Sequence, residues 1–83
     1  MDDLKLASIL RRMYDDAKRN EAVSQINLFG ILYAEEIKAS SSTLKELVAL
    51  SGINMGYVTE VSKGVKLAKY VVPKEGRENN ENN

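Results

Sequence analysis

The chain has 83 residues, with 12 basic and 12 acidic side chains, 43% apolar residues, and neither cysteine nor histidine. A chain of this length forms one hydrophobic core, because small domains bury only about 60% of the surface that they expose when unfolded. The absence of cysteine and histidine excludes disulfides, thiolate nucleophiles and zinc-thiolate sites, and it removes the commonest general base. The sequence therefore predicts a single domain that is not an enzyme, with no catalytic residues, no metal ion and no cofactor.

Charge is distributed unevenly along this neutral chain. Residues 41–74 carry five basic and two acidic side chains, and the four charged residues between Val61 and Lys74 are all lysines. We therefore expect a local positive potential in the C-terminal half. No apolar run approaches the roughly 18 residues that cross a bilayer, and the sequence opens Met-Asp-Asp instead of with a signal segment. These features predict a cytoplasmic protein that has no membrane partner.

The first predicted helix runs from Asp2 to about Arg19. Asp2 and Asp3 suit its start, and Lys18 with Arg19 suits its end, because these charges complement the helix dipole. The apolar residues recur at spacings of three and four, which places them on one helical face. This face consists of Leu6, Ile9, Leu10, Met13, Tyr14 and Ala17.

A second, more apolar helix is predicted over residues 24–38. Its apolar positions surround most of the helix axis, so we expect it to be central and buried on several sides. Gly30 in its interior costs up to about 1 kcal/mol relative to alanine. Close approach of a neighbouring helix would explain this glycine.

Two short helices joined by a glycine-containing turn are predicted next. Thr43 and Glu46 have the spacing of a capping box, which predicts a helix start at Leu44. Gly52 supplies the left-handed conformation that ends this helix. Asn54 is expected to cap the following helix, which we predict to end near residue 64.

The remaining residues divide into an ambiguous segment and a tail. Residues 65–72 fit either a short helix to about residue 70 or an extended strand before Pro73, and we favour a helix with an extended end. From Lys74 onward there is no apolar residue, which is typical of disorder. The predicted organisation is an all-α bundle of four to five helices, with a domain at 1–73 and a disordered tail at 74–83.

Residues 44–64 carry small, apolar and basic residues in a characteristic spacing: Leu47, Ser51, Gly52, Ile53, Tyr57, Val58, Glu60, Val61, Lys63 and Gly64. This pattern resembles the helix-turn-helix of the lambda-repressor and Cro superfamily. The segment from Ile26 to Ile37 is also similar to a compact family of small helix-turn-helix-like bacterial and phage proteins. Such a corner needs glycine at its turn and inward apolar groups on both sides of it.

The resemblance implies that the chain is a small transcription regulator that binds double-stranded DNA sequence-specifically. The second helix of the motif would lie in the major groove, with the following lysines on phosphates. Because the neutral monomer would hold DNA weakly, we expect a homodimer. The residues expected to contact DNA are Asn54, Met55, Gly56, Thr59, Ser62, Lys63, Lys66 and Lys69.

An alternative interpretation is a protein-binding module or inhibitor that reuses the same corner. The expected DNA-facing surface has no arginine or glutamine, and Met55 with Gly56 offers only apolar or backbone contacts. Glu60 would repel phosphate if it faced outward. Another protein is therefore the alternative partner, because a scaffold does not by itself determine what it binds.

Overall fold

The computed structural model describes residues 1–72, and within this range every regular element is helical. This architecture confirms the predicted all-α bundle of four to five helices. The predicted tail at 74–83 lies outside the described residues. The elements are α1 (Asp3–Asp15), α2 (Ala22–Leu32), α3 (Ala34–Ala39), α4 (Leu44–Ser51), the short 3₁₀ helix η1 (Met55–Tyr57) and α5 (Val58–Leu67).

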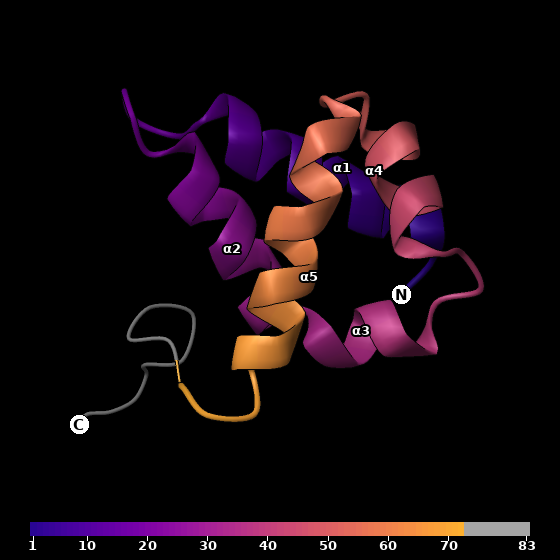
Figure 1. Cartoon of the computed structure of the whole chain (residues 1–83). Coiled ribbons are helices and arrows are strands. Elements are labelled where there is room, and N and C mark those ends of the chain that lie inside the picture. Colours follow the sequence, from indigo (N-terminus) through magenta and orange to yellow (C-terminus); the bar gives the residue numbers. More distant parts are fainter. Residues whose placement is uncertain (73–83) are drawn as a thin grey trace.

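The helices form two packed pairs, α2 with α5 and α1 with α4, and α1 also contacts α2. In Figure 1, α5 crosses the front of the molecule between α2 and α4, and α1 lies behind it. The short helix α3 runs along the base and leads the chain from α2 towards α4. This arrangement places α5 against α2 on one side and leaves its opposite side at the surface.

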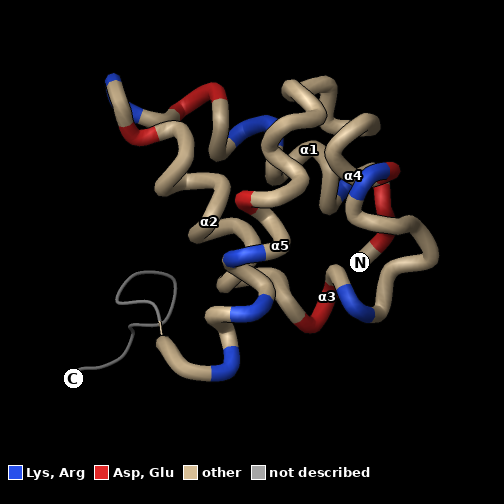
Figure 2. Tube along the Cα trace, viewed as in Figure 1, with Lys and Arg blue, Asp and Glu red and all other residues tan. Residues whose placement is uncertain are grey.

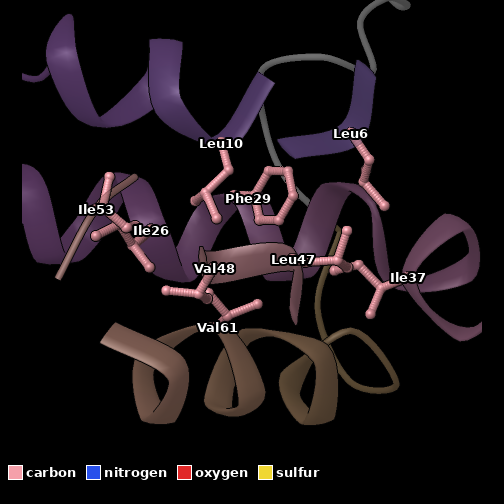
Figure 3. Packing of buried hydrophobic residues seen from close by; sticks show 9 residues of the cluster. All are labelled: Leu6, Leu10, Ile26, Phe29, Ile37, Leu47, Val48, Ile53 and Val61. Atoms are coloured by element: carbon pink, nitrogen blue, oxygen red, sulfur yellow. The ribbon is translucent and has the colours of Figure 1, made fainter. Parts of the chain in front are cut away.

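The core collects side chains from all five α-helices and from the turn before η1 (Figure 3). Phe29 of α2 is fully buried among the others. Full burial of one large aliphatic or aromatic side chain contributes about 1.5–3 kcal/mol relative to its exposure, so this cluster is the main source of stability. Its members are Leu6, Leu10, Ile26, Phe29, Ile37, Leu47, Val48, Ile53 and Val61.

Helices α2 and α5 approach each other through two glycines. A Cβ atom added to Gly30 would lie 2.5 Å from the carbonyl oxygen of Val61, and one added to Gly64 would lie 2.2 Å from the carbonyl oxygen of Asn27. Both distances are far shorter than a carbon–oxygen contact allows. The prediction that Gly30 marks the close approach of another helix is confirmed, and Gly64 is its counterpart on α5.

The expected helix end near Gly64 is wrong, because α5 continues through this residue to Leu67. Glycine stands here to permit a helix contact and not to terminate the helix. After Leu67 the chain turns, with the amide of Tyr70 donating to the carbonyl of Leu67 at 2.8 Å. Residues 71 and 72 belong to no helix or strand. Of the segment predicted to be helical to about residue 70, only residues 65–67 are helical, as the last turn of α5.

Two other predicted helices also differ in their bounds. The first ends at Asp15 and not near Arg19, because the chain turns through Asn20, whose φ is +67°, to enter α2. The helix predicted over 24–38 begins earlier and is divided at Tyr33 into α2 and α3. Hydrogen bonds continue across this division, since the amide of Tyr33 donates to Phe29 and that of Ile37 donates to Tyr33. The division is therefore a kink, and it directs Ile37 into the core.

The start of α1 is bound to the link between α3 and α4 through Asp3. Its carboxylate accepts hydrogen bonds from the hydroxyls of Ser40 at 2.8 Å, Ser41 at 3.0 Å, and Ser42. The bond from Ser42 is the largest cause that lowers the pKa of Asp3, followed by that from Ser40, because both favour the charged form. The N-terminal turn of α1 and the entry to α4 are thus held together by one carboxylate.

We expect Gly30→Ala and Gly64→Ala each to destabilise the domain by about 2–3 kcal/mol, because an added methyl group forces the two helices apart. Urea unfolding followed by circular dichroism measures this loss. Ser24→Ala, at an exposed position of α2, is the matched control and should change stability by less than about 0.5 kcal/mol. Wild-type stability in either glycine variant would show that the crossing is not tight.

Asp3 should make the stability of the domain depend on pH in the acid range. Since its pKa is lower in the folded chain than the ordinary value of about 3.9, its contribution is present above that value and is lost as pH falls through the folded pKa. Melting temperatures measured from about pH 5 to about pH 2 should therefore fall less steeply for Asp3→Asn than for the wild type. Parallel curves for the two proteins would contradict this role.

Candidate nucleic-acid interface

The corner between α4 and α5 begins with the predicted capping box. The backbone amide of Thr43 donates to the Glu46 carboxylate at 2.7 Å, and the amide of Glu46 donates to the Thr43 hydroxyl at 3.1 Å. Helix α4 ends at Gly52, whose φ of +82° lies in the left-handed region. Both signals predicted from the sequence are confirmed, and together they fix the length of α4 and the direction of the chain after it.

The turn after α4 is held by a buried serine and by an arginine of α1. The hydroxyl of Ser51 is buried, where it donates to the carbonyl of Val48 at 2.6 Å and accepts from the amide of Ile53 at 3.3 Å. From α1, the guanidinium of Arg11 donates to the carbonyl of Ser51 at 3.4 Å. Ile53 is buried in the core cluster. These contacts hold the entry to the second helix of the corner in one position.

The second helix of the corner starts as a 3₁₀ turn. The side chain of Asn54 accepts from the amide of Gly56 at 2.7 Å and so caps η1, and α5 begins at Val58. The helix predicted to start directly after Asn54 therefore begins with one tight 3₁₀ turn, and the α-helix follows it. The ring of Tyr57 packs against that of Tyr14 on α1, with ring centroids 5.6 Å apart.

The exposed face of α5 carries part of the predicted DNA-contacting set. Thr59, Lys63 and Lys66 are exposed at spacings of four and three, which places them on one face of the helix. Met55 in η1 precedes Thr59 by four residues and is 47% exposed. Figure 2 shows basic positions gathered along the C-terminal half of α5 and just beyond it. We call Met55, Thr59, Lys63 and Lys66 the α5 face.

The other predicted residues lie beside this face and not on it. Ser62 is half-buried, and Lys69 lies in the turn that follows α5. Asn54 and Gly56 are exposed, but they line a hollow of about 380 Å³ between η1 and the first two helices. The structure thus brings four of the eight predicted residues onto one surface. The complete lining of the hollow is Tyr14, Val23, Asn54, Gly56, Tyr57 and Glu60.

Glu60 is held against α2. Its side chain is only 23% exposed, and its carboxylate accepts from the side-chain amide of Asn27 at 3.1 Å. The same amide also donates to the backbone carbonyl of Glu60 at 2.8 Å. The second carboxylate oxygen lies 3.5 Å from the ammonium group of Lys63. Sequence reasoning missed Asn27, because a single polar residue in an apolar helix does not indicate its partner.

Ion pairing is sparse on this side of the molecule. Within residues 1–72 the pairs are Arg11 with Asp15 and Lys63 with Glu60, so neither Lys66 nor Lys69 has a carboxylate partner there. The described chain contains no group of three or more acidic, histidine or cysteine side chains that could hold a metal ion. None of its helices has both the length and the apolar character that a bilayer-spanning segment needs.

A family model described as an HTH-like domain matches residues 2–74, which is most of the chain. The chain belongs to this family. Membership confirms that the α4–α5 corner belongs to a domain of the helix-turn-helix type, whereas the closer relation to the lambda-repressor and Cro superfamily remains a prediction. No curated protein and no solved structure matches the chain.

In this HTH-like domain, Gly52→Ala should cost about 1–2 kcal/mol, because alanine is strained in the left-handed conformation. The added Cβ would also lie 3.0 Å from a guanidinium nitrogen of Arg11. Gly52→Asn is the matched variant and should lose less, since asparagine tolerates this conformation better. Thermal unfolding of both variants measures the difference. Equal stability of the alanine variant and the wild type would mean that the turn does not require a left-handed residue.

Proposed function

We propose that this HTH-like domain binds double-stranded DNA as a small transcription regulator, with α5 in the major groove. The observation that carries the proposal is the exposed α5 face, on which Lys63 and Lys66 lie one turn apart at the surface of a helix-turn-helix corner. A helix presented in this way fits the width of the major groove. The domain that performs this function extends over residues 1–73.

The residues of the interface have different tasks in this proposal. Lys63, Lys66 and Lys69 contact phosphates, because a lysine supplies a point charge without base selectivity. Met55, Thr59 and Ser62 approach base edges through apolar or hydroxyl contacts. Asn54 and Gly56 bring the first turn of the helix close to the backbone of the duplex.

Binding is expected to require a homodimer. The chain has no net charge, so a single copy gains little from long-range attraction to DNA. Two copies double the number of lysine–phosphate contacts and bring two recognition helices to one duplex. Dimeric helix-turn-helix proteins place these helices in successive major grooves, about 34–36 Å apart.

A second candidate function, docking of another protein, is favoured by apolar groups at the corner. Leu50 at the end of α4 is 49% exposed and Met55 is 47% exposed. A hollow of about 400 Å³ on the outer side of α4 is lined by Ala49 and Leu50 together with Ser42 and Glu46. A protein that docks here would bind through apolar contacts, which are less sensitive to salt than lysine–phosphate contacts.

The variant Lys63→Glu/Lys66→Glu separates the two functions. If the domain binds DNA, duplex affinity should fall by about 10- to 100-fold at low salt, because two phosphate contacts become repulsive. The slope of log affinity against log salt should decrease by about 1 per lysine removed. Fluorescence anisotropy with labelled random-sequence duplex at several salt concentrations measures both quantities.

The control for this experiment is Lys18→Glu/Arg19→Glu, which makes the same charge change in the exposed loop between α1 and α2. Its affinity should change much less, since this loop lies away from the α5 face. Circular dichroism shows whether each variant is folded. Equal affinity loss in both double variants would assign binding to net charge alone, and no wild-type binding at low salt would favour the docking function.

A further inference from the structure

We infer that Asn27 is a positioning residue for the DNA-binding surface, because it holds the Glu60 carboxylate against α2 and keeps its charge away from phosphate. This inference rests on the proposed function and adds a residue that does not itself touch DNA. Glu60 is the one acidic residue of α5 (Val58–Leu67). It follows Thr59 directly and precedes Lys63 by three residues, so its position borders the α5 face.

The geometry around Glu60 fixes both carboxylate oxygens. Oε1 accepts from the Asn27 amide at 3.1 Å, and Oε2 lies 3.5 Å from Nζ of Lys63. Asn27 is half-buried on the side of α2 that packs against α5, whereas the side chain of Lys63 is 61% exposed. The exposed lysine can turn towards a phosphate, but the asparagine cannot follow the carboxylate into solvent. Asn27 is therefore the partner that restrains Glu60.

The same helix crossing that requires glycine brings Asn27 to Glu60. The carbonyl oxygen of Asn27 is the atom that a Cβ on Gly64 would strike, at 2.2 Å. Asn27 lies one turn before Gly30 on α2, and Glu60 lies one turn before Gly64 on α5. With the two backbones this close, a side chain as short as asparagine spans the gap and reaches both the backbone and the side chain of Glu60.

Release of the carboxylate would oppose DNA binding. A free Glu60 side chain can extend towards the phosphates that Lys63 and Lys66 contact. Repulsion between two unit charges about 6 Å apart at a wet surface is enough to change affinity by about three- to tenfold. The asparagine thus converts an unfavourable residue on the recognition helix into one that is nearly neutral for binding.

A double-mutant cycle on the full chain tests this role, with duplex affinity measured at low salt for the wild type, Asn27→Ala, Glu60→Gln and the double variant. We expect Asn27→Ala to weaken binding by about three- to tenfold. Glu60→Gln removes the charge that Asn27→Ala releases, so the gain in affinity that it causes should be about three to ten times larger in the Asn27→Ala background than in the wild type. If Asn27 only stabilised the fold, Glu60→Gln would increase affinity by the same factor in both backgrounds.

Asn27→Asp provides a second cycle in case the alanine variant does not fold. It keeps the size of the side chain and replaces the hydrogen bond with charge repulsion, so Glu60→Gln should again help more in this background. Ser24→Ala on the exposed side of α2 should leave affinity unchanged. Equal gains from Glu60→Gln in all backgrounds would overturn the positioning role of Asn27 and leave the proposed function standing. Absence of wild-type binding would overturn the proposed function and this inference together.

Discussion

The contact between Gly30 and Gly64 sets the position of α5, and the rest of the surface depends on it. Because neither glycine has a Cβ atom, the backbones of α2 and α5 come so close that backbone atoms of one helix fill the space that a Cβ on the other would need. Such an approach allows little adjustment, because backbone cannot rotate away as a side chain can. Helix α5 turns Val61 and Gly64 towards the rest of the bundle and leaves Thr59, Lys63 and Lys66 exposed, and these three residues form the α5 face together with Met55.

The turn at Gly52 sets the direction in which the chain enters α5. The capping box fixes where α4 begins, the left-handed glycine fixes where it ends, and Arg11 ties the end of α4 to α1. None of these interactions is large, since a helix cap contributes about 1 kcal/mol and a single hydrogen bond about 0.5–1.5 kcal/mol. Their effect is geometric, because each removes one way in which the entry to α5 could shift relative to the core.

Sequence reasoning was most accurate where the cause is local, and among tertiary contacts it predicted the close approach at Gly30 but not its counterpart on α5. Helix periodicity, the capping box at Thr43 and the turn at Gly52 follow from neighbouring residues, and all are present. Gly64 was misjudged because a glycine that ends a helix and one that permits a helix contact look the same in one sequence. The kink at Tyr33 was missed for a similar reason, since the non-helical backbone of Tyr33 and the packing of Ile37 into the core appear only in the folded chain.

The chemistry of the α5 face follows from the balance between its lysines and Glu60. A neutral chain acquires a basic surface only by separating its charges, and here the separation is made within one helix. Asn27 and Lys63 draw the carboxylate to one side of α5, while Lys66 projects from the exposed side and Lys69 follows just beyond its end. Glu60 and the lysines share one helix, and the contact with Asn27 at the crossing holds the carboxylate against α2, while Lys66 has no carboxylate partner among the described residues.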